Sequence, residues 1–133
     1  MSDQLRKFQQ QGDTQALIVY GQSLGQDIQA LNAVIDLLGV VFDSLSLGLL
    51  PDYDVLDSDK LLQYQNELGF VVGLMMQSPA ADMKSAAMHI VSKLDLDSFI
   101  PDLNSALKSE HDWIRTEAAA ALASMGKVSS KSG

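Results

Sequence analysis

Histidine is the side chain best suited to acid–base chemistry at neutral pH, and this chain contains two. His89 flanks an apolar stripe, and His111 lies in a polar turn beside Glu110 and Asp112. The sequence contains no HExxH zinc motif, no GxSxG nucleophile elbow and no GxxxxGK[ST] phosphate loop. Cysteine is absent, which excludes thiolate metal ligands and thiol nucleophiles. These residue types predict a protein that is not an enzyme and has no catalytic residues and no cofactor.

The carboxylates of residues 48–59 have the composition of a calcium loop but not its spacing. An EF-hand needs oxygen ligands at positions 1, 3, 5 and 12, and glycine at position 6. Counting from Asp52, position 5 is Leu56 and position 12 is Gln63, and neither supplies a carboxylate. We therefore expect no metal site in this segment.

The same segment is expected to form a protruding loop that presents Tyr53 among carboxylates. Pro51 ends the structure before the loop, and Asp57 or Ser58 begins the helix after it. An aromatic ring among acids on a loop is suited to contact a basic protein surface. The expected partner-binding residues are Asp52, Tyr53, Asp54, Asp57 and Asp59.

Charge is distributed unevenly along the chain. The formal net charge is −8 at pH 7, and residues 8–59 contain eight aspartates but no lysine or arginine. Such a region repels nucleic-acid phosphates and attracts basic partners, so we expect no nucleic-acid binding. An acidic surface that serves only solubility is the other interpretation, and both stay open. The lack of cysteine and of an apolar leader in residues 1–11 favours a cytoplasmic, bacterial-type protein.

The composition indicates one globular, all-α domain. Hydrophobic residues make up 47% of the chain and aromatic residues only 6%, so the core must be mainly aliphatic and alanine side chains. The apolar run of residues 34–50 is long enough to raise the question of a membrane span. Because Asp36 and Asp43 interrupt it and no basic residue anchors it, we expect a buried central helix and no membrane contact.

Start and stop signals divide the chain into about six to seven helices. The expected ranges are 3–11, 14–24, 28–46, 59–77, 79–94, 97–107 and 112–125. Asp97 and Asp112 are expected N-caps, and Gly69 and Gly73 are expected to allow a close helix crossing. Trp113 is expected to be a packing wedge at the start of the last helix.

A shift of 31 residues superposes the apolar positions of the last two helical pairs. Met83 falls on Ile114, and Val91 falls on Leu122. An internal period of roughly 20–50 residues is typical of a helical solenoid.

These features resemble a HEAT repeat, which has a proline in its first helix, an acid in its turn and an alanine-rich second helix opened by an apolar–basic pair. The resemblance is clearest over residues 97–126 and degenerate over 64–94. It rests on Ile100-Pro101-Asp102-Leu103, Leu107, Asp112-Trp113-Ile114-Arg115, Ala118 and Ala121-Leu122.

The resemblance implies a short right-handed α–α superhelix of stacked helical hairpins. In that family the turn acid and the basic residue form a ladder between neighbouring repeats. Asp112 with Arg115, and more loosely Asp82 with Lys84, would supply this ladder here. We expect one helical-repeat domain over residues 1–126, followed by a flexible tail, 127–133, because the tail has few packing residues.

The resemblance also implies a protein-interaction module without naming its partner. Together with the acidity it predicts a non-enzymatic module that binds a basic protein, such as an adaptor or a small immunity or antitoxin-like protein. Two alternatives stay open. One is a subunit similar to the HEAT-like bilin lyases, although no bilin-binding motif is visible, and the other is a structural subunit that forms homo-oligomers.

Overall fold

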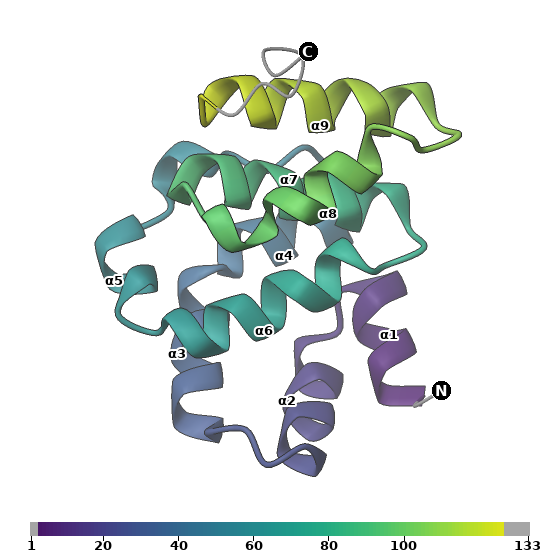
Figure 1. The fold of residues 1–133 in the computed structure, drawn as a ribbon. Helices are drawn as coiled ribbons and strands as arrows, with labels where there is room; N and C mark the ends of the chain where they lie inside the picture. The colour runs from purple at the N-terminus through teal and green to yellow at the C-terminus, as the bar shows by residue number, and fades with distance from the viewer. Residues whose placement is uncertain (1–2, 127–133) are drawn as a thin grey trace.

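The computed structural model describes residues 3–126, and their regular structure is entirely helical (Figure 1). The all-α prediction is therefore confirmed for these residues, whereas the expected tail of 127–133 lies outside them. The first helices of the chain are α1 (Asp3–Gln11), α2 (Thr14–Ser23), α3 (Ile28–Leu37) and α4 (Gly39–Ser46). They are followed by the 3-10 helix η1 (Tyr53–Val55), α5 (Ser58–Leu62), α6 (Gln65–Met76), α7 (Ala81–Leu94), the 3-10 helix η2 (Asp97–Phe99), α8 (Ile100–Ala106) and α9 (Asp112–Ser124).

Local signals at the helix ends account for several of these boundaries. Asp13, Asp27 and Asp57 each accept a hydrogen bond from a backbone N–H in the first turn of the helix that follows. Gly12 and Gly25 adopt positive φ angles of 70° and 79° after α1 and α2. Glycine reaches this left-handed region without steric cost, so the chain reverses there.

Two of the expected long helices are wrong, and each is split in two. Residues 28–46 bend by 65° between α3 and α4, where the fully buried Leu38 ends α3 and Gly39 begins α4. Residues 59–77 break at Tyr64, whose φ and ψ of −116° and 48° are not helical. Neither glycine nor proline marks this second break, so tertiary packing rather than a local signal decides it. The described part of the chain therefore has nine α-helices instead of six or seven.

Two expected N-caps are also wrong by a residue or more. Asp97 lies in η2 and caps no helix through its side chain, and α8 begins three residues later with Pro101 in its first turn. Asp112 is the first residue of α9, and His111 occupies the N-cap position. The expected start of α7 at residue 79 moves to Ala81, and the Ser78 hydroxyl accepts from the Ala80 backbone N–H in the turn before the helix.

The C-terminal half consists of two helical pairs, α6 with α7 and α8 with α9. Short connections turn the chain back within each pair, and α9 packs against α7 (Figure 1). The residues that the 31-residue shift superposes are buried alike, since Met83, Ala87 and Val91 in α7 and Ile114, Ala118 and Leu122 in α9 are all at most 4% exposed. The repeated apolar positions of α7 and α9 thus share the same degree of burial.

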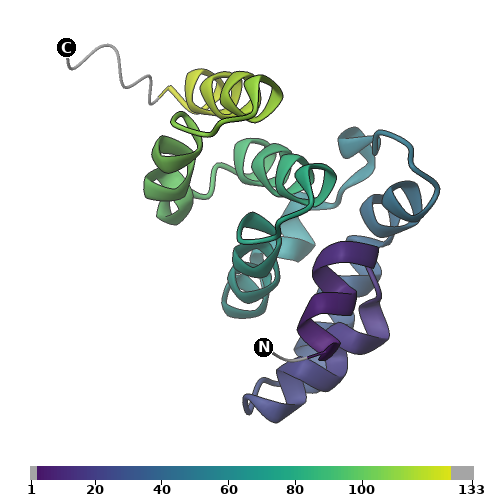
Figure 2. The same ribbon diagram turned by 90° about the vertical axis from the view of Figure 1, so that its right-hand side faces the viewer.

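The N-terminal helices form a second group that leads into these pairs. Helix α1 packs on α2, α2 on α3, and α3 on α6, so the helices progress from the N-terminal group through α6 and α7 to α8 and α9 (Figure 2). Two hydrogen bonds tie α1 to the end of α6. The Gln9 side chain donates to the Leu74 carbonyl at 2.7 Å, and the Ser78 hydroxyl donates to the Gln9 carbonyl at 2.7 Å.

The expected close approach at Gly69 and Gly73 does not occur. A Cβ atom added to Gly69 would meet nothing within 4 Å, and one added to Gly73 would meet only Phe99, at 3.8 Å. The tight glycine is Gly21 in α2, where an added Cβ would lie 2.5 Å from Cδ1 of the buried Leu31. The close contact thus lies between α2 and α3.

Within residues 3–126, no single helix is both long and apolar enough to cross a membrane. Only the bent pair α3 and α4, taken together, meets that criterion of length and composition.

A pair of alanine substitutions tests this packing. We expect Gly21→Ala to lower the free energy of unfolding by about 1–3 kcal/mol, because the new methyl group collides with the buried Leu31. Gly69→Ala is expected to raise the free energy of unfolding by about 0.5–1 kcal/mol, because alanine suits a helix interior and the site is open. Urea denaturation measures both. A stabilising Gly21→Ala would contradict the α2–α3 contact.

Candidate functional site

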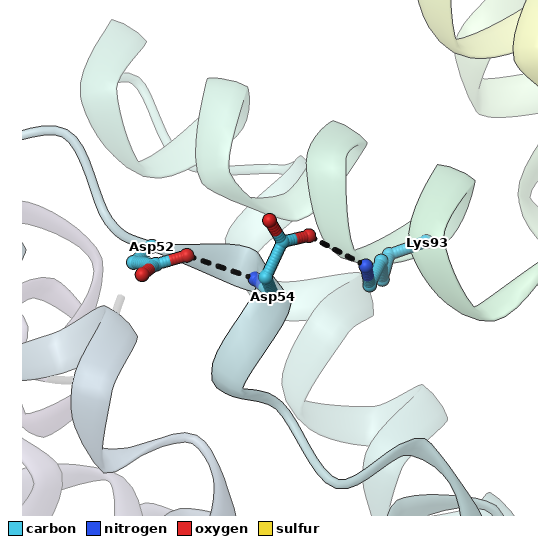
Figure 3. A network of polar contacts seen from close by, with 3 residues as sticks. All are labelled: Asp52, Asp54 and Lys93. Atoms are coloured by element: carbon cyan, nitrogen blue, oxygen red, sulfur yellow. Dashed lines mark hydrogen bonds and ion pairs between the residues drawn. The ribbon is translucent and has the colours of Figure 1, made fainter.

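The acidic segment expected to bind a partner is anchored on α7. The Asp52 carboxylate accepts a hydrogen bond from the backbone N–H of Asp54 at 3.1 Å, and Lys93 Nζ of α7 lies 2.8 Å from Asp54 Oδ1 (Figure 3). The hydrogen bond from Lys93, reinforced by the lysine charge, holds the pKa of Asp54 below its usual range. Both partners are solvent-exposed, so this ion pair orients the segment more than it stabilises the fold.

The other two aspartates expected to bind a partner, Asp57 and Asp59, lie at the start of α5. Asp57 caps α5 by accepting from the Lys60 backbone N–H at 3.2 Å, and Asp59 is exposed in the first turn of the same helix. Three of the four aspartates are therefore engaged in caps or an ion pair. Because these aspartates are exposed, they still contribute to the negative potential of this region.

Tyr53 is not presented to solvent in the way its sequence context suggests. Its ring is half-buried and stacks on His89 of α7, with ring centroids 4.8 Å apart and planes inclined by 15°. The hydroxyl oxygen is buried and has no hydrogen-bond partner among residues 3–126. Burial, with a further contribution from the Glu117 charge, raises the pKa of Tyr53 well above its ordinary value. The side chain is thus a neutral anchor rather than an exposed contact.

His89 connects this anchor to the last helix. Its Nε2 atom pairs with Glu117 Oε1 of α9, and the same carboxylate oxygen accepts a hydrogen bond from the Ser85 hydroxyl at 3.0 Å. We call Tyr53, His89 and Glu117 the junction, because together they join η1, α7 and α9. The serine donates to the carboxylate and not to the histidine, so these contacts do not form the serine–histidine pair of a nucleophilic site.

The residues expected to form a ladder between repeats are placed differently. Arg115 pairs with Asp112 within α9, and its guanidinium also donates to the Ser109 carbonyl at 2.6 Å. Over residues 3–126, no ion pair joins Asp82 or Lys84 of α7 to α9. Polar contact between α7 and α9 comes instead from the junction, which the sequence pattern did not identify.

A groove with mixed apolar and polar walls lies beside the junction. Its cavity of about 200 Å³ is bounded by the segment after α4, the start of α7 and the start of α9. The lining residues are Leu45, Gly48, Leu49, Leu50, Pro51, Tyr53, Asp82, Ser85, Ala86 and Trp113.

Three exposed apolar side chains, Leu49, Leu50 and Trp113, line this groove. Seven large hydrophobic residues are exposed in the described part of the chain, and five of them belong to residues 47–55 or to Trp113. We call these five the apolar rim: Leu47 (72% exposed), Leu49 (58%), Leu50 (76%), Val55 (60%) and Trp113 (46%). Because Leu49, Leu50 and Trp113 of this rim line the groove, exposed apolar surface gathers there.

The sequence contained a partial signal for this surface. Residues 47–50 are apolar but follow the end of the expected helix 28–46. Leu49 and Leu50 lie between Gly48 and Pro51, where no helical periodicity can bury them. Trp113 was expected to be a packing wedge, and nearly half of its surface is instead exposed.

Neither metal coordination nor a known relative explains the site. Among residues 3–126, no group of three or more histidine, aspartate or glutamate side chains is arranged to hold a metal ion. Comparisons of the chain with protein families, with curated proteins and with solved structures give no match.

Tyr53→Phe tests the buried hydroxyl. At pH 7 we expect the free energy of unfolding to stay equal or to rise by up to about 1 kcal/mol, because an unpaired buried hydroxyl is removed. Above the ordinary tyrosine pKa of 10.0, the unfolded chain loses the Tyr53 proton while the folded chain keeps it. Stability is then lost as pH rises. The wild type should therefore weaken relative to Tyr53→Phe between pH 10 and 11.5.

Urea denaturation of both proteins across this pH range measures the difference. A constant difference from pH 7 to pH 11.5 would show that the Tyr53 hydroxyl titrates alike in the folded and unfolded chain, which contradicts its burial.

Proposed function

We propose that the protein is a non-enzymatic interaction module that binds a basic protein through the groove and its apolar rim. The observation that carries this proposal is that three exposed apolar side chains, Leu49, Leu50 and Trp113, line one groove. Interfaces combine an apolar, often aromatic, centre with a polar periphery, and Trp113 beside Leu49 and Leu50 has that composition.

The charge of the surrounding region supports a basic partner. Residues 8–59 carry eight aspartates without a lysine or arginine, and Asp82 adds a carboxylate to the wall of the groove. Only Asp54 of this region pairs with a cation among the described residues. A negative potential of this kind accelerates association with basic proteins and opposes association with acidic ones.

The arrangement of the two helical pairs supports a HEAT-like superhelix as the scaffold. Helices α7 and α9 are neighbours, and their superposed apolar positions are equally buried. A scaffold of stacked helical pairs offers an extended surface to a partner protein. An adaptor, or an immunity-type inhibitor that covers a basic protein, would use such a surface.

Photo-cross-linking in the cells that produce the protein tests the proposal. A photoreactive phenylalanine analogue replaces Leu50 in the rim, and the control replaces Val19, an exposed apolar residue of α2. We expect the position-50 variant to cross-link a basic protein that the control does not capture. Identical adducts at both positions, an acidic adduct, or an adduct of two copies of this chain would contradict the proposal.

Charge variants then test the role of the carboxylates with the purified adduct partner. Asp52→Asn with Asp82→Asn should weaken binding about three- to tenfold at low salt, and less at high salt, because screening removes the attraction. Asparagine still caps η1, so the fold is retained. The matched control is Asp27→Asn with Asp102→Asn, which also changes one capping and one first-turn aspartate. Equal losses in both double variants would contradict a local role.

A further inference from the structure

We infer that the groove binds an amphipathic basic helix of the partner, which inserts one large apolar side chain beside Trp113 and directs a lysine or arginine to Asp82. This inference rests on the proposed function and specifies the partner's chemistry. Three features support it: the size of the groove, the lack of a strand edge within residues 3–126 and the single free carboxylate in the wall.

The size of the groove favours a side-chain anchor. Its volume of about 200 Å³ is below the range of roughly 300–1,000 Å³ typical of small-molecule pockets. Leu49, Leu50 and Trp113 supply walls of aliphatic and aromatic carbon. A large apolar side chain that fills a desolvated pocket of this kind contributes much of the binding energy of a protein interface.

The backbone around the groove favours a helical ligand. Extended peptides commonly bind by adding a strand to an exposed sheet edge, but residues 3–126 contain no strand. The recognition mode that fits a groove between α7, α9 and the segment after α4 is a helix that lays its apolar face into it. Apolar residues of such a ligand recur three or four positions apart, so one enters the groove while the next contacts the rim.

The polar groups of the wall favour a cation. Ser85 already donates its hydroxyl hydrogen to Glu117, and the Tyr53 hydroxyl is buried. Asp82 is exposed, and within residues 3–126 its carboxylate has no hydrogen bond or ion pair. A basic side chain one helical turn from the anchor would meet this carboxylate. A second copy of this acidic chain would instead bring a like-charged surface to the groove.

Trp113 provides the readout, because it is the only tryptophan of the chain and lines the groove. The probes are three synthetic peptides of about four helical turns. One has a leucine face and a lysine face, the second replaces lysine by glutamate, and the third replaces leucine by serine. We expect only the leucine–lysine peptide to shift the Trp113 emission to shorter wavelength and to bind in fluorescence anisotropy.

Substitutions at exposed positions localise the binding. Leu50→Ser should weaken the leucine–lysine peptide about tenfold or more, which is the effect expected of a contact at the centre of an interface. Asp82→Asn should weaken it about threefold at low salt. Val19→Ser, on α2, is the matched control and should leave affinity within about twofold.

The outcomes separate this inference from the proposed function. If no peptide binds, but the position-50 cross-link still captures a basic protein, the helix inference is overturned and the proposed function stands. Equal binding of the leucine–lysine and serine–lysine peptides would overturn the inference by showing attraction without an anchor. A doubled mass in light scattering that Leu50→Ser abolishes would also overturn it and would assign the groove to a second copy.

Discussion

The burial of α7 is the constraint on which the rest of the structure depends. Eight of its 14 residues are buried, which is more than the single stripe that a surface helix covers. The helix therefore needs neighbours on more than one side, and α6, α9, α4 and η1 supply them. Its consecutive small residues Ser85, Ala86 and Ala87 leave room for these neighbours to approach closely. The two helical pairs meet at α7 for this reason.

The same helix also determines where the candidate binding surface lies. His89 and Lys93 of α7 hold Tyr53 and Asp54, which fixes residues 47–55 along one side of the helix. Glu117, paired with His89, holds α9 along the other side. The groove is the space between these two attachments, and Ser85 and Ala86 of α7 form part of its wall.

The apolar rim and the acidic charge together describe a surface that is costly to leave uncovered. Leu47 and Leu50 are more than 70% exposed, although burying a leucine side chain contributes about 1.5–3 kcal/mol. The chain forgoes this contribution at several neighbouring positions. Its carboxylates keep such a face hydrated and discourage contact between like-charged copies, while they attract a basic surface.

The sequence by itself determined the helical class, the starts of the first three helices and the buried face of α7 and α9. These properties depend on local information, namely capping aspartates such as Asp13 and apolar residues repeated at helical spacing. Only the tertiary structure decided the breaks at Leu38 and Tyr64, the inward position of Tyr53 and the exposure of Trp113. Each of these depends on which neighbouring helix covers the side chain. The periodicity of one helix carries no information about which other helix packs against it.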